Sequence, residues 1–145
     1  ASALKKVGGF SPLFFHYGED VDYIHRMRFY GYRVGYTPLT SGCHDRQNRP
    51  ITRETQMKLD RVYYLSVVSD LNSGLAKCLW GGLAPLKPGM LALLRGRFKE
   101  FCFYTGTSVR LLCRYLSIAE IKRFCKQGRP VFLENVHSKI KPIWS

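Results

Sequence analysis

VGGFSPLFFHYGEDVDYIHRMRFYGYRVGY, residues 7 to 36, is the stretch that decides the fold. Two glycines and a proline near its start predict a turn after an opening helical segment. Acidic residues follow Gly18, and apolar residues then recur at helical spacing as far as Gly31, a residue type that often ends a helix in the left-handed conformation. We therefore expect a helix over about residues 18 to 30.

The next segment has the pattern of a short strand. Tyr32, Val34 and Tyr36 alternate with Arg33 and a glycine, which is the period of two that strands show, and a proline at position 38 ends the pattern. A second extended piece is expected to run to residue 44.

Helices are expected over most of the remaining chain. Apolar spacing predicts a long helix from residue 51 to about 71 and another from residue 90 to about 104. Between them, residues 75 to 88 are apolar but interrupted by glycine and proline. The spacing of Ser117 and Glu120 is that of a capping box, so the last helix should begin there and end near Gln127.

Charge is distributed unevenly along the 145 residues, whose formal net charge is +13. Residues 1 to 45 carry a net charge of +1, and residues 46 to 145 carry +12. Such a field attracts polyanions, which are nucleic acid or the anionic face of a membrane. The five cysteines include no C-x-x-C pair, which is typical of free thiols in a reducing cytoplasm.

The residues quoted above resemble the second half of the catalytic domain of family 2 glycosyltransferases. That family's pattern is a Gly-Gly-Phe turn, an aromatic pair, Gly-Glu-Asp, a helix with an arginine, Gly-Tyr-Arg, a strand, proline and then histidine. The match is close over residues 1 to 44 and looser to about residue 75. The resemblance implies an α/β fold: residues 1 to 74 would be the C-terminal, acceptor-side half of a GT-A domain with short strands, and residues 75 to 145 a mainly helical basic extension.

The resemblance also implies an activity, the inverting transfer of a sugar from a nucleotide-sugar donor to a glycan or lipid-linked acceptor in bacterial surface polysaccharide synthesis. The enzyme would be of the hexosyl- or rhamnosyltransferase type. Inversion needs a carboxylate beside the attacking hydroxyl to take its proton. Asp20 would be that base, since an aspartate is ionised at neutral pH and a helix start favours the anion. Glu19 would orient the acceptor.

Further residues receive roles from the resemblance alone. Acceptor contacts would come from these positions: Phe15, Tyr17, Gly18, Asp22 and Arg26. His44 would be a ligand of a divalent cation, Mg²⁺ or Mn²⁺, whose main Asp-x-Asp ligands lie upstream and outside this chain. Because the chain starts like the middle of a helix, we expect a fragment that is inactive alone. Without the pattern, the acidic residues would be helix caps and the aromatic residues would belong to the core.

Residues 75 to 126 combine apolar positions with arginine and lysine, which suits an interfacial helix on anionic lipid as well as a solvated face over a core. No apolar run reaches the roughly 20 residues of a membrane span. We expect a cytoplasmic protein, peripheral at the inner membrane face, that binds no nucleic acid. The alternatives are a basic nucleic-acid-binding module without catalysis, for which no recognisable motif is present, and an inactive scaffold.

Overall fold

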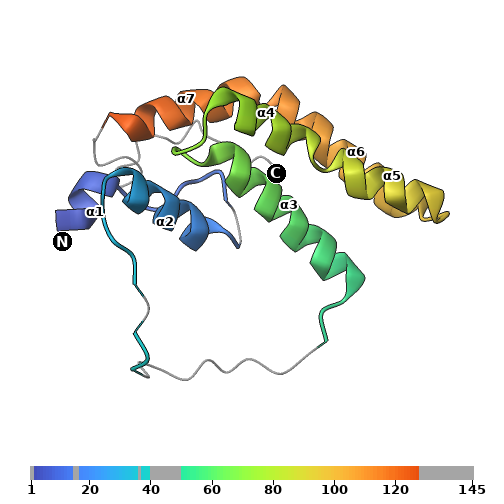
Figure 1. Cartoon of the computed structure of the whole chain (residues 1–145), viewed down its shortest axis with the longest axis horizontal. Helices are drawn as coiled ribbons and strands as arrows, with labels where there is room; N and C mark the ends of the chain where they lie inside the picture. Colours follow the sequence, from blue (N-terminus) through green and yellow to red (C-terminus); the bar gives the residue numbers. More distant parts are fainter. Residues whose placement is uncertain (1, 15–16, 36, 40–49, 128–145) are drawn as a thin grey trace.

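The computed structural model describes residues 2–14, 17–35, 37–39 and 50–127, and in this part of the chain it contains seven helices and no strand. Figure 1 shows their arrangement. The helices, in chain order, are α1 (Ser2–Val7), α2 (Glu19–Phe29), α3 (Arg53–Ser69), α4 (Leu75–Leu83), α5 (Leu86–Leu94), α6 (Phe98–Cys113) and α7 (Tyr115–Lys126).

The predicted α/β fold is therefore wrong, and the resemblance to the GT-A family is not borne out by the fold. The described residues of the predicted strand, 32 to 35, have no regular secondary structure. Arg33 and Val34 are exposed to solvent and pair with no second strand. Alternation of side chains favours a strand only where a neighbouring strand completes the hydrogen bonds, and among the residues described here none does.

The predictions for α2 and α3 are confirmed, and local signals mark the end of α2 and the start of α3. The N–H groups of Gly31 and Tyr32 donate to the carbonyls of Arg28 and Met27, and Gly31 has a φ of 79°. This is the glycine-terminated motif expected from the sequence. The hydroxyl of Thr52 accepts a hydrogen bond from the N–H of Thr55 at 3.2 Å, so it caps the first turn of α3.

The predictions for residues 75 to 104 need correction. The apolar run interrupted by glycine and proline forms two helices, and the single helix expected from residue 90 is broken at Gly96, whose φ is 68°. Gly81 packs against the side chains of Val67 and Val68 in α3, so contact between helices favours a small residue there. Pro88 is the third residue of α5, in the first turn, where no N–H donor is needed.

The last helix begins earlier than its capping box predicted. α7 starts at Tyr115, directly after α6, and Ser117 lies within its first turn. Its end at Lys126 agrees with the prediction. The amino group of Lys122 lies 3.4 Å from the carbonyl of Val68 and 3.2 Å from that of Ser73, so it joins α7 to the end of α3 and the turn that follows.

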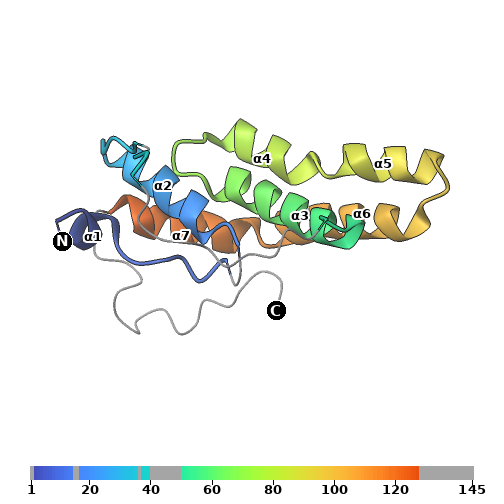
Figure 2. The same ribbon diagram turned by 90° about the horizontal axis from the view of Figure 1, so that it is seen from below.

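Figures 1 and 2 show α4 and α5 following one another along one side of the molecule, while α6 and α7 run back in the opposite direction. α6 packs against α5 and α4, and α7 packs against α3 and α6. α3 packs against α4, α6 and α7, and α1 packs against α2. The main core contains residues from before and after position 74. The predicted boundary between two parts at this position stays a prediction. The members of this core are Leu13, Phe14, Leu65, Val68, Leu71, Leu111, Ile118, Ile121 and Cys125.

None of the described helices has the length and the apolar character that a membrane span requires.

Candidate functional site

The candidate catalytic carboxylates lie at the start of α2. Gly18 precedes the helix with a φ of 85°, Glu19 is half-buried, and Asp20 is exposed. The Oδ1 atom of Asp20 accepts a hydrogen bond from the N–H of Val21 at 2.8 Å. The unpaired N–H groups of a first helical turn favour an anion. Asp20 therefore has a defined position while its carboxylate remains open to solvent.

A buried arginine fixes this helix to the turn between α1 and α2. The guanidinium group of Arg26 donates to Asp22 Oδ2 at 2.8 Å, to the carbonyl of Val7 at 2.8 Å and to the carbonyl of Gly9 at 2.7 Å. Burial raises the pKa of the Asp22 carboxyl, and the charge and hydrogen bond of Arg26 oppose this rise. We call Asp22, Arg26 and the two carbonyls the arginine clamp. The sequence predicted a helix carrying Arg26, but not its partners on the turn.

The residues predicted to contact an acceptor lie in different environments. Asp22 and Arg26 are buried in the arginine clamp, Tyr17 is exposed, and Gly18 is buried. The Oε2 atom of Glu19 is buried and has no hydrogen-bond partner among the described residues. A buried carboxylate oxygen usually has a donor, so this atom marks a place where a water molecule or a ligand group would be favourable. The acceptor-binding roles stay predictions.

Phe15 and His44 lie outside the described residues, so their predicted roles stay predictions. In the part of the chain that is described, no three histidine, cysteine, aspartate or glutamate residues are grouped so as to hold a metal ion. The predicted Mg²⁺ or Mn²⁺ likewise stays a prediction.

An added methyl group at Gly18, directly before α2, should destabilise the fold around the candidate catalytic carboxylates. A methyl group at Gly18 would lie 2.3 Å from Val62 Cγ1 and within 3.2 Å of the Phe14 ring, in addition to the strain of a positive φ. Gly18→Ala is expected to lower the free energy of unfolding by about 2 to 4 kcal/mol. Gly31→Ala is a matched control: its φ is also positive, at 79°, but apart from its chain neighbours no atom of the described residues lies within 4 Å of the added carbon. Urea unfolding should show a loss of only about 1 to 2 kcal/mol in the control, and equal losses would contradict the steric argument.

A second candidate site is the outer surface of α4 and α5. It exposes large apolar side chains along both helices: Leu75, Leu79, Trp80, Leu83, Leu86, Met90, Leu91, Leu93 and Leu94. We call these nine residues the α4–α5 apolar surface. Contiguous apolar area of this kind on a protein surface usually marks an interaction site.

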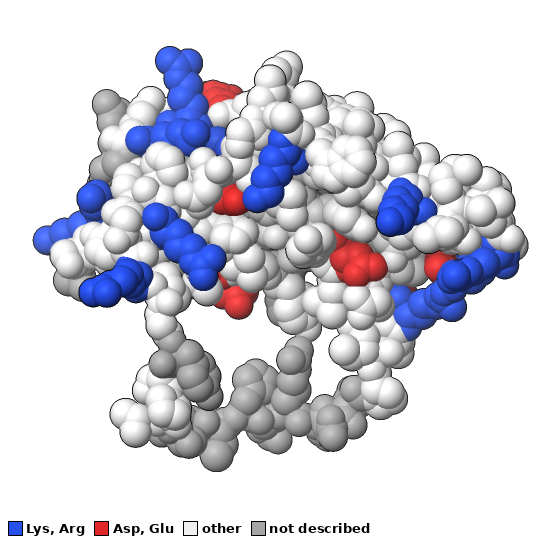
Figure 3. All heavy atoms as spheres, viewed as in Figure 1, with Lys and Arg blue, Asp and Glu red and all other residues white. Residues whose placement is uncertain are grey.

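The chain segment that carries the α4–α5 apolar surface has charged residues of one sign. The sequence holds no aspartate or glutamate from residue 71 to residue 99, but it holds five basic residues there: Lys77, Lys87, Arg95, Arg97 and Lys99. In Figure 3, Lys and Arg side chains lie at the right-hand end of the molecule, where Figure 1 shows α5 ending and α6 beginning, and also over its left half. The sequence predicted membrane contact over residues 75 to 126, and the described exposed apolar residues are concentrated in its first part.

Comparison of the whole chain with family models, with curated proteins and with solved structures finds no match, so the fold and the two candidate sites rest on the residues themselves.

Proposed function

We propose that this chain attaches to an anionic membrane surface through the α4–α5 apolar surface, and that Asp20 supplies the general base for transfer of a sugar to an acceptor hydroxyl. The α4–α5 apolar surface is the observation that carries the first part. Trp80 and Leu94 are 74% and 80% exposed, although burial of side chains of this size favours the folded or bound state by about 1.5 to 3 kcal/mol each. The boundary between the headgroups and acyl chains of a membrane would bury these two side chains.

Charge supports a membrane rather than a neutral apolar partner. A helix that lies in the membrane interface combines an apolar face with lysine and arginine, and each basic residue near an anionic surface contributes about 1 kcal/mol. The stretch without acidic residues, 71 to 99, includes all of α4 and α5. The cytoplasmic leaflet carries the anionic lipids, so we place the protein at the inner face of the cell membrane.

Replacing the most exposed large apolar residue of α4 and of α5 tests this attachment. The double variant Trp80→Ser/Leu94→Ser should partition onto vesicles with phosphatidylserine about 100-fold more weakly than the wild type, since each lost side chain removes about 1.5 kcal/mol or more. Leu39→Ser is the matched control, because Leu39 is 78% exposed but lies in the segment between α2 and α3. Flotation of the control should equal that of the wild type.

Flotation of the wild type, together with a nucleic-acid binding assay, distinguishes membrane attachment from the alternative of a nucleic-acid-binding module. Wild-type protein that fails to float with anionic vesicles at low salt, but binds generic duplex DNA or RNA in a salt-sensitive way, would overturn membrane attachment and favour phosphate neutralisation along a nucleic acid.

Sugar transfer is the second part of the proposal, and the start of α2 supports it. Asp20 is exposed on a helix that the arginine clamp fixes, and beside it Glu19 has a buried oxygen with no hydrogen-bond partner among the described residues. An exposed carboxylate of fixed position can accept the proton of an acceptor hydroxyl as that hydroxyl attacks the anomeric carbon. The proposed transfer activity is independent of the proposed membrane attachment. A comparison of the Asp20→Asn variant with the wild type in a transfer assay tests it.

A further inference from the structure

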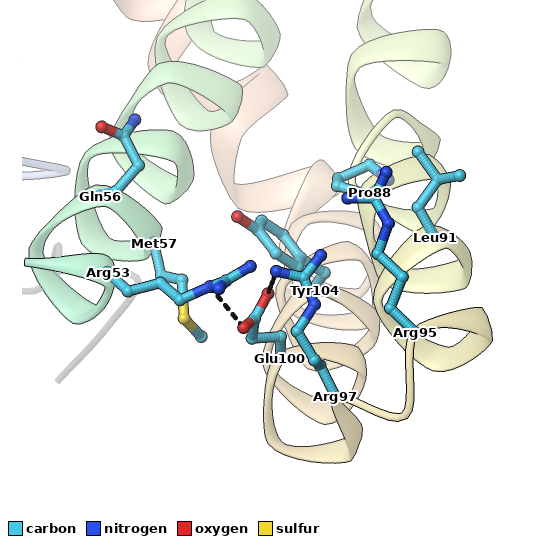
Figure 4. Close-up of a pocket in the computed structure, with 9 residues that line it drawn as sticks. All are labelled: Arg53, Gln56, Met57, Pro88, Leu91, Arg95, Arg97, Glu100 and Tyr104. Carbon is cyan, nitrogen blue, oxygen red and sulfur yellow. Dashed lines mark ion pairs between the residues drawn. The ribbon is translucent and has the colours of Figure 1, made fainter.

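A pocket of about 210 Å³ opens where the start of α3 faces the turn between α5 and α6. Figure 4 shows three arginine side chains around it, one from the start of α3 and two from the turn between α5 and α6. Arg53 is the first residue of α3, Arg95 follows the last residue of α5, and Arg97 precedes α6. Residues 53 and 97 are far apart in the sequence, so the fold alone brings these cations together.

One carboxylate partly neutralises the three arginines. Glu100 Oε1 lies 2.6 Å from Arg53 Nε, and its Oε2 lies 3.6 Å from Arg97 Nη1. Figure 4 shows both ion pairs as dashed lines that meet at Glu100. The four side chains keep a formal excess of two positive charges. The Nε donor of Arg97 is buried and has no hydrogen-bond partner among the described residues.

The donors that remain suit a phosphate group. Guanidinium groups bind phosphate oxygens through pairs of parallel N–H donors, and two excess positive charges balance a phosphomonoester dianion. The side chain of Arg53 is 60% exposed and that of Arg97 is 27% exposed, so an incoming anion can reach both.

The other residues of the pocket wall are partly polar, Gln56 and Tyr104, and partly apolar. Met57, Pro88 and Leu91 line it beside the arginines. Leu91 also belongs to the α4–α5 apolar surface, so the pocket opens next to the surface that we place on the membrane. A ligand with a phosphate head and a hydrocarbon part would contact both kinds of wall.

We propose that this pocket binds the phosphomonoester headgroup of a membrane lipid, with Arg53 and Arg97 as the phosphate ligands and Glu100 holding both in place. The inference rests on the proposed membrane attachment for the source of the ligand. An alternative role for these ion pairs is only to join α3 to α6, and the experiment distinguishes the two.

The test compares the wild type with the double variant Arg53→Gln/Arg97→Gln on two kinds of vesicle of equal anionic charge. One contains phosphatidic acid and the other phosphatidylserine, each in phosphatidylcholine. The wild type should prefer phosphatidic acid by about tenfold, as a single well-placed charged contact provides. The double variant should lose this preference. A variant of matched charge, Lys87→Gln/Lys99→Gln, should keep it. Equal weakening by both double variants would overturn the inference.

A soluble ligand separates this inference from membrane attachment itself. Monomeric dihexanoyl phosphatidic acid should bind the wild type and shift the NMR signals of residues around Arg97, whereas the double variant, once its folding is verified by circular dichroism, should not respond. Binding of the monomer without vesicle flotation would refute membrane attachment and keep the pocket. Flotation without binding of the monomer would refute the pocket. Equal affinity for free glycerol phosphate would refute a lipid as the ligand.

Discussion

Asp20→Asn should reduce sugar transfer by about 10²- to 10⁴-fold, the contribution expected of a general base. Asparagine keeps a side-chain oxygen that can accept the hydrogen bond from the Val21 N–H, now 2.8 Å from Asp20 Oδ1, and it is equally suited to a helix start. The variant should therefore fold normally and lose only the group that takes the proton. The assay measures the release of nucleoside diphosphate from a panel of nucleotide-sugar donors in the presence of an acceptor extract. It compares the variant with the wild-type protein.

Glu54→Gln is the matched control for Asp20→Asn. Glu54 is an exposed acidic residue in the first turn of α3, where it forms an ion pair with Lys58 at 3.2 Å. The same loss of one charge at a helix start should leave transfer unchanged. Full transfer activity in Asp20→Asn would refute the role of Asp20 as the base.

Arg26→Ala should lower the free energy of unfolding by about 3 to 5 kcal/mol, which is the usual effect of leaving one partner of a buried ion pair alone. The substitution leaves the Asp22 carboxylate, 5% exposed, without its charge partner and removes the donors to the carbonyls of Val7 and Gly9. Urea unfolding followed by circular dichroism measures the loss. Arg28→Ala is the control on the same helix, since Arg28 is exposed, and it should change stability by no more than about 0.5 kcal/mol.

The loss in Arg26→Ala should depend on pH. Burial raises the pKa of Asp22, and removal of Arg26 takes away the group that opposes this rise. In the folded variant, Asp22 then binds a proton at a pH where the unfolded chain, with a pKa of about 4, does not. The variant should gain stability relative to the wild type as the pH falls from 7 toward 4.5. A constant difference between the two proteins across this range would show that Asp22 is not the source of the loss.

Local sequence signals predicted α2 and α3 correctly, because the groups that begin and end these helices lie within a few residues of one another. At the end of α2 the N–H groups of Gly31 and Tyr32 donate to carbonyls of the last turn. At the start of α3 the hydroxyl of Thr52 accepts a hydrogen bond from the N–H of Thr55. The strand expected around Val34 is wrong because a strand depends on hydrogen bonds to a second strand, which the described residues do not supply. The sequence predicts that glycine interrupts residues 75 to 88, whereas Gly81 lies inside α4. The need for a small residue at this position comes from the close approach of Val67 and Val68 in another helix.

The candidate sites divide in the same way. The sequence by itself determined the two acidic residues at the start of α2 and the absence of acidic residues from 71 to 99, because composition and helix starts need no tertiary contact. Only the tertiary structure decided that Arg26 reaches the carbonyl of Gly9, and that Arg53 meets Glu100 at 2.6 Å. These partners lie 17 and 47 positions apart, and only tertiary packing can bring groups at such separations into contact.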